Sequence, residues 1–180
     1  MFKKLTTQDM VYAAIFAALI SVLSYISIPI PFSPVPVTGQ SLAVMLAGAI
    51  LTTRQAGLSM GIFLLLGAIG IPVFSQGRGG IGVFMGPSGG YLIGYLVGAI
   101  VISLIIQDKK SYLHIGLANI IGGILVVHLL GIIWLNIITD MGLQKSLMAG
   151  SLPFIPGDLL KATLATIISV PIIKRLKGSL

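Results

Sequence analysis

The chain has 180 residues, of which 56% are hydrophobic and only 8% are charged. A soluble domain carries roughly a quarter charged residues, so this composition excludes an ordinary soluble protein and predicts an integral membrane protein. The net charge of +7 does not indicate nucleic-acid binding, because the basic residues lie in the gaps between apolar runs, and the absence of cysteine excludes disulfides and thiolate sites.

Six apolar segments are long enough for membrane helices, if two of them stop short of one interface. They cover about residues 10–28, 38–53, 55–73, 88–107, 112–138 and 157–173. Because apolar runs occupy the whole length, we predict a single transmembrane domain over residues 1–180. Its expected fold is all-α, a compact bundle of six transmembrane helices with structured outer loops.

The connections between these segments differ in their content of Lys and Arg. One side holds eight: Lys3, Lys4, Arg54, Lys109, Lys110, Lys174, Arg175 and Lys177. The other side holds Arg78 and Lys145, and Lys161 falls inside the last segment. Since short loops rich in Lys and Arg stay in the cytoplasm, we expect both termini to be cytoplasmic.

Three connections on the expected outer side have unusual compositions. The first, "PIPFSPVPVTGQ", contains four prolines, which forbid helix and predict a stiff extended strip. The second, "FSQGRGGIGVFMGPSGG", is rich in glycine and lets its backbone approach a ligand closely. The third ends in "PFIPG". Together they are expected to form a lid or cup over the outer helix ends.

Two of the few charges, Asp158 and Lys161, lie at the outer start of the last segment, one helical turn apart. Ionisable residues at membrane depth usually face the bundle interior or a cavity. One interpretation is a structural ion pair in which Asp158 also caps the helix dipole. The other is a substrate site, because a carboxylate accepts from N–H groups and an ammonium donates to a carbonyl oxygen, which suits a urea-like or amide-like ligand.

Other residues near these connections are candidates for the same site. Arg78 is either a clamp for a substrate carboxylate or a solvated loop residue. Gln76, Gln40 and Thr38 either hydrogen-bond a ligand or cap helix ends. Tyr91 either forms a pocket wall or belongs to the aromatic belt at the membrane interface.

The two histidines do not indicate a metal site or catalysis. His114 and His128 have no carboxylate at ligand spacing. A proton relay needs a chain of titratable partners, so we predict that His128 is hydrogen-bonded to a neighbouring helix instead. The sequence contains no P-loop motif and no Ser, His and acid set, which favours binding and transport over an enzyme and predicts no cofactor.

Small residues recur at helical spacing in two segments. Ala13, Ala14, Ala17 and Ala18 form two overlapping patterns near the cytoplasmic end of the first segment, where a partner subunit can dock. Glycines recur every fourth residue over residues 86–98, and for these we predict close helix packing within the bundle.

Three blocks of the sequence resemble the BioY family, the biotin-binding S components of energy-coupling factor (ECF) transporters. They are "PIPFSPVPVTGQSLAVMLAGAIL" at 29–51, "LLGAIGIPVFSQGRGGIGVFMGPSGGYLIGY" at 65–95 and "LPFIPGDLLKA" at 152–162. The similarity extends over nearly the whole chain, and the family's compact six-helix fold agrees with the number of segments.

The resemblance implies a high-affinity biotin binder in the plasma membrane of a prokaryote, surrounded by lipid and energised by a T component and two ATPase subunits. The family's GDLLK motif corresponds to Gly157, Asp158 and Lys161, which are therefore implied to hold the ureido ring of biotin. The resemblance also implies that Tyr91 and the glycine-rich loop 77–82 line the same pocket.

Two further assignments accompany the resemblance. Ala14 and Ala18 are implied to face the T component. Arg78 as the partner of the biotin carboxylate extends the family pattern, because some relatives have a polar amide in this stretch.

Three alternatives remain at this point. An S component for another vitamin is one, although a flavin requires more aromatic surface than the outer connections offer. A membrane-embedded enzyme using Asp158 and His128 is the second, and a structural membrane scaffold is the third. A transporter predicts that His128→Ala leaves biotin binding intact, whereas an enzyme predicts that it abolishes turnover.

Overall fold

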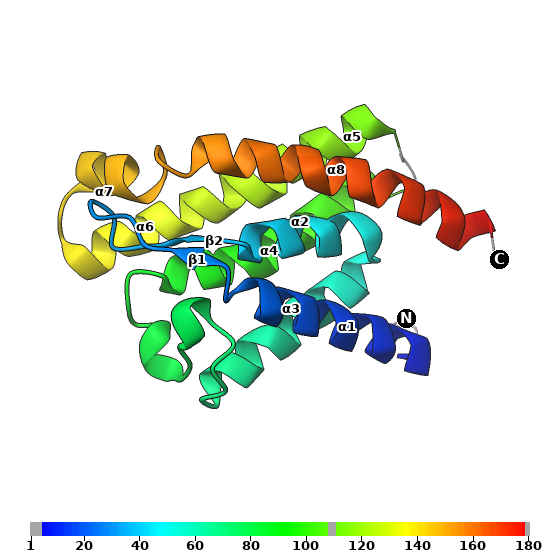
Figure 1. The fold of residues 1–180 in the computed structure, drawn as a ribbon, viewed down its shortest axis with the longest axis horizontal. Coiled ribbons are helices and arrows are strands. Elements are labelled where there is room, and N and C mark those ends of the chain that lie inside the picture. Colours follow the sequence, from blue (N-terminus) through cyan, green and yellow to red (C-terminus); the bar gives the residue numbers. More distant parts are fainter. Residues whose placement is uncertain (1–4, 108–110, 179–180) are drawn as a thin grey trace.

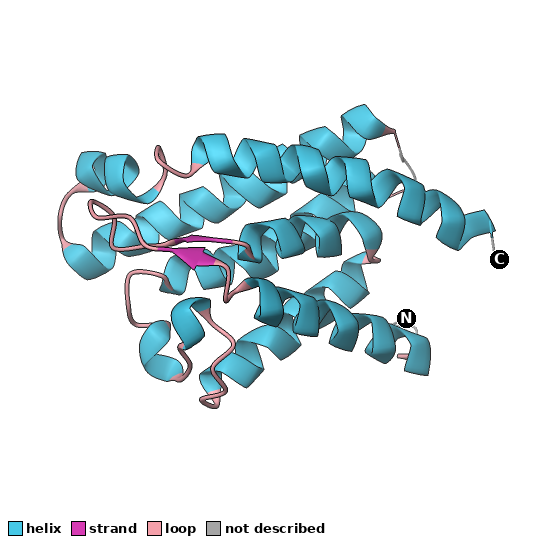
Figure 2. Ribbon diagram, viewed as in Figure 1, coloured by secondary structure: helices cyan, strands magenta, loops and turns pink. Residues whose placement is uncertain are grey.

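Helices dominate the computed structural model, which describes residues 5–107 and 111–178 (Figures 1 and 2). They are α1 (Thr7–Leu23), α2 (Gln40–Ile50), α3 (Thr53–Ala68), α4 (Gly89–Ile106), α5 (Tyr112–Ala118), the π-helix η3 (Asn119–Val126), α6 (Val127–Thr139), α7 (Leu143–Gly150) and α8 (Ile155–Gly178). The segments α5, η3 and α6 follow one another without a break. Four lysines of the expected charge asymmetry lie outside the described residues: Lys3, Lys4, Lys109 and Lys110.

Each predicted apolar segment coincides with a helix or with the run from α5 to α6, but the predicted count of six helices is not reproduced. The described residues also contain α7, which lies inside the connection 139–156. Among these residues three helical runs are long and apolar enough to cross a membrane: α4, Tyr112–Thr139 and Ile155–Arg175. Because α1 and α2 are shorter apolar helices, the number of membrane crossings stays a prediction.

Local sequence sets where two of the helices begin. Thr6 accepts from the backbone N–H of Asp9, whose carboxylate accepts from Thr6 in return, and this capping box starts α1. Thr52 and Gln55 form the same box at the start of α3. Gln55 also donates to Asp9 at 2.7 Å, so the two boxes tie the start of α1 to the start of α3.

Helix α4 lies at the centre of the bundle and contacts α2, α3 and α6. Its glycines Gly90, Gly94 and Gly98 allow this close approach, as predicted, whereas Gly86 precedes the helix and a Cβ there would meet nothing closer than 3.5 Å. A Cβ atom at Gly90 would lie 2.2 Å from Cβ of Trp134, and one at Gly98 would lie 2.5 Å from the carbonyl oxygen of Gly122. The helices could not pack this closely with larger residues at these positions.

The four-proline connection forms no helix and folds over one end of the molecule (Figure 2). Its flanks pair as a short antiparallel ribbon of β1 (Ser27–Ile28) and β2 (Val37–Thr38). The ribbon lies beside the start of α8, where Lys161 contacts the backbone oxygen of Thr38. It therefore covers the end of the molecule at which α8 begins.

The glycine-rich connection contains two 3-10 turns, η1 (Ser75–Gly77) and η2 (Ile81–Val83). Phe74 anchors it, because its buried ring makes edge contacts with Phe63 and Phe84 at centroid distances of 5.3 and 5.4 Å. A Cβ atom at Gly67 would collide with this ring. The ring of Phe74 thus attaches the connection to the core.

Candidate functional site

Asp158 lies in the first turn of α8 and Lys161 one turn further along the same helix. The Lys161 ammonium donates to Oδ1 of Asp158 at 3.0 Å. The side chains are 7% exposed for Asp158 and 17% exposed for Lys161. The sequence therefore predicted correctly that these two charges face one another inside the molecule.

The carboxylate of Asp158 is held from three helices. Its Oδ1 atom accepts from Ser41 of α2 at 2.9 Å as well as from Lys161. Its Oδ2 atom lies 2.9 Å from Nε2 of His128 in α6. The prediction that His128 bonds to a neighbouring helix is confirmed, and its partner is the carboxylate of the proposed site.

Lys161 links α8 to the ribbon and to α2. Its Nζ donates to the backbone oxygen of Thr38 at 2.8 Å and to Oγ of Ser41 at 3.0 Å, besides Asp158. An ammonium has three donors, so all of them are used. A ligand oxygen can bind Lys161 only by replacing one of these partners.

Two adjoining cavities lie beside this cluster, between the ribbon, α4, α6 and α8. They share a wall of Val35, Pro36, Thr38, Tyr91 and Tyr95. The first is also lined by the charged cluster and the ring of Phe154, and the second by Gln40, Ser75 and Ser88. Their volumes are about 30 and 20 Å³, room for a water molecule or two in each.

The predicted site residues fall into two groups. Asp158, Lys161, Thr38, Tyr91 and Gln40 converge on the two cavities. The hydroxyl of Tyr91 donates to the backbone oxygen of Gly150, which fixes the ring in the wall. Gln40 is 3% exposed, and its Nε2 group has no hydrogen-bond partner among residues 5–107 and 111–178, so it is a buried donor at the second cavity.

Arg78, Gln76 and Gly157 do not line either cavity. Arg78 donates to the backbone oxygen and the hydroxyl of Ser75, both at 3.2 Å, and only Ser75 reaches the second cavity. Gln76 is exposed, with a φ of 62° in the turn. A Cβ atom at Gly157 would meet nothing within 4 Å, so no close contact requires glycine there.

The four alanines of α1 also divide into two groups. Ala13 and Ala17 are 1% and 2% exposed and pack inside the molecule, so they offer no surface to a partner. Ala14 and Ala18 are exposed on the outside of α1. A docking surface on this helix can therefore include only the second pair.

Sequence reasoning missed Ser41, Tyr95, Ser88 and Ser151 as members or neighbours of the site. Ser41 lies in the first turn of α2 and bonds Asp158 through its side chain, whereas Thr38 lies in β2 and bonds Lys161 through its backbone oxygen, so no helical spacing connects the two. His128 and Asp158 are 30 residues apart, so no local pattern connects them. The described residues contain no group of three His, Cys, Asp or Glu side chains suited to a metal ion.

Residues 1–178 of the chain match the model of the BioY family. The chain is 40% identical to the biotin transporter BioY of Rhizobium etli, over 91% of this chain and 92% of the relative. It is 42% identical to the probable biotin transporter BioY of Bacillus subtilis, over 95% and 93%. A crystal structure of the S component for biotin from an ECF-type ABC transporter superimposes with a TM-score of 0.88 and 34% identity, covering 95% of each chain.

Proposed function

The chain belongs to the BioY family, and from this membership we propose that it is a biotin-binding S component of an ECF-type transporter. The matched relatives are transporters, not enzymes, which removes the membrane-embedded enzyme from the alternatives. The observation that carries the proposal is the buried pair of Asp158 and Lys161 beside a cavity with aromatic walls.

The chemistry of this pair suits the ureido group of biotin. Asp158 offers an acceptor for a ureido N–H group, and Lys161 offers a donor for the ureido carbonyl. Tyr91, Tyr95 and Phe154 supply apolar surface for the fused rings. The unpaired Nε2 of Gln40 is a donor for the polar end of the ligand's tail at the second cavity.

Ligand entry requires the site to open. Pockets for small molecules usually hold several hundred Å³, whereas the first cavity holds about 30 Å³. The four-proline connection contributes Val35, Pro36 and Thr38 to its wall, and Lys161 bonds the backbone oxygen of Thr38. We expect a biotin oxygen to replace the backbone oxygen of Thr38 as a hydrogen-bond acceptor of the Lys161 ammonium. The ribbon, released from this bond, is then expected to move outward.

Transport requires partners, since the sequence has no ATP-binding motif. We propose that a T component and two ATPase subunits supply the energy and that the T component docks on the exposed Ala14 and Ala18. Their small side chains permit close helix contact, and the exposed Met10, Ile15 and Val22 extend the apolar surface of α1. The setting is the plasma membrane of a prokaryote, with both termini in the cytoplasm.

The proposal is tested by equilibrium binding to the purified protein in detergent, with biotin, riboflavin and thiamine in parallel. We expect saturable binding of biotin alone. Binding of riboflavin or thiamine in preference to biotin makes the chain an S component for another vitamin. A folded protein that binds none of the three contradicts the proposal.

A further inference from the structure

His128 connects the charged cluster to the corner between α7 and α8. Its Nε2 atom lies 2.9 Å from Oδ2 of Asp158, and its Nδ1 atom lies 2.8 Å from Oγ of Ser151. All three residues are at most 6% exposed. Because an ionised carboxylate only accepts, Nε2 carries the hydrogen, and a neutral ring then accepts at Nδ1 from the Ser151 hydroxyl.

The hydrogen bonds to Asp158 show what His128 contributes. A carboxylate has about four acceptor positions, two on each oxygen. Ser41 and Lys161 occupy those of Oδ1. Oδ2 has one hydrogen-bond partner among the described residues, His128, so it retains one position for a ligand N–H. Donors at both oxygens prevent the carboxylate from rotating about its last bond.

The ring of His128 is itself fixed. It makes edge contacts with Tyr91 and Phe154, each at a centroid distance of 6.2 Å, and Ser151 holds its far nitrogen. Tyr91 and Phe154 also line the first cavity. Tyr91 and Phe154 therefore both hold His128 and form part of the wall of the first cavity.

We propose that His128 is a positioning residue of the ligand site, which orients Oδ2 of Asp158 to accept one N–H group of the ligand. The inference rests on the proposed function, because the ligand is taken to be biotin. It replaces the expectation from the sequence that a His128 substitution leaves binding intact. That expectation treated His128 as remote from every acid, whereas the fold places it on Asp158.

Two amide substitutions separate the nitrogens of the ring. In His128→Gln the amide nitrogen reaches the place of Nε2 and keeps the donor to Asp158, whereas in His128→Asn it reaches only the place of Nδ1. We expect His128→Gln to bind biotin within about threefold of wild type, since the donor is retained. We expect His128→Asn and His128→Phe to lose about 10- to 100-fold in affinity, the effect of one hydrogen bond to a charged group.

A role in packing alone predicts a different order, with both amide variants equally weak or equally intact, and either result overturns the inference. A second measurement uses the ligand-free protein. We expect His128→Asn to lower the melting temperature in the wild type, because it leaves a buried carboxylate oxygen unpaired, and to have little effect in an Asp158→Asn background.

The two measurements separate this inference from the proposed function. If the wild type does not bind biotin, the proposed function fails, and the role of His128 in positioning that ligand's partner fails with it. If the wild type binds biotin but the two amide variants bind it equally, the inference alone fails. Strictly additive effects of positions 128 and 158 on the melting temperature also overturn the inference.

Discussion

At the scale of residues, the site keeps two charges inside an apolar molecule by completing their hydrogen bonds. Lys161 uses all three donors, and Asp158 accepts from Ser41, Lys161 and His128. Removing one member of a buried pair leaves an uncompensated charge, which is strongly destabilising. If a ligand oxygen replaces the backbone oxygen of Thr38, Lys161 still makes three hydrogen bonds. Ligand binding therefore need not leave either buried charge without a partner.

Arg78 does not line either cavity, but it bonds a residue that does. Its guanidinium has five donors, and two of them contact Ser75 at the edge of the second cavity. If Arg78 binds the carboxylate of biotin, Arg78→Ala should lower the affinity for biotin about 10-fold or more and should not change the affinity for biotin methyl ester. Titration of both ligands against both proteins checks this. An equal loss for acid and ester contradicts the assignment.

At the scale of elements, sequence reasoning located the helices well because apolar runs between charged or proline-rich breaks define them. The helix α7 was missed, since its eight residues include Gln144, Lys145 and Ser146 and are too short and polar to resemble a membrane segment. The pairing of β1 with β2 was also missed, because prolines indicate only that helix is absent. The site's charged pair was predictable from local spacing, whereas Ser41 and His128 join it only through tertiary packing.

Helix α1 offers the second test at this scale. We expect Ala18→Trp to prevent co-purification of the T component, because a large ring separates surfaces that small residues bring together. The matched control is Ile137→Trp, which enlarges a position of α6 that is 65% exposed and lies outside the proposed docking surface of α1. Biotin binding should be unchanged in both variants. Normal co-purification of the Ala18 variant removes this position from the docking surface.

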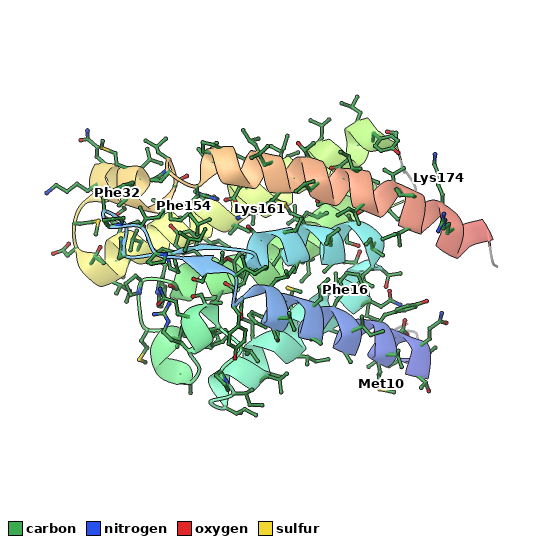
Figure 3. All side chains as sticks on the ribbon, in the orientation of Figure 1. Met10, Phe16, Phe32, Phe154, Lys161 and Lys174 are labelled. Carbon is green, nitrogen blue, oxygen red and sulfur yellow. The ribbon has the colours of Figure 1, made fainter. Side chains whose placement is uncertain are left out.

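At the scale of the whole molecule, the two ends differ in construction. The ribbon, α7 and the start of α8 gather at one end, and the start of α1 and the end of α8 lie at the other (Figure 1). Lys161 lies between these ends, and Phe32 and Lys174 mark opposite ends (Figure 3). The proposed ligand site adjoins the start of α8, and the distribution of Lys and Arg predicts that this end faces the outside of the cell.

The orientation can be measured with single cysteines, because the chain has none of its own. Phe32→Cys occupies an exposed position between β1 and β2, and Lys174→Cys an exposed position near the end of α8. A membrane-impermeant maleimide applied to intact cells should label position 32 at once and position 174 only after permeabilisation. The reverse pattern contradicts cytoplasmic termini.

The central claim is that biotin binds on the pair of Asp158 and Lys161, and the most direct measurement is biotin affinity in Lys161→Met. This change keeps a long apolar stem and removes the ammonium, and Lys174→Met makes the same change at the far end of the molecule. We predict at least about a 10-fold loss of affinity for Lys161→Met in a protein that stays folded, with Lys174→Met unchanged. Wild-type affinity in a folded Lys161→Met protein would contradict the account.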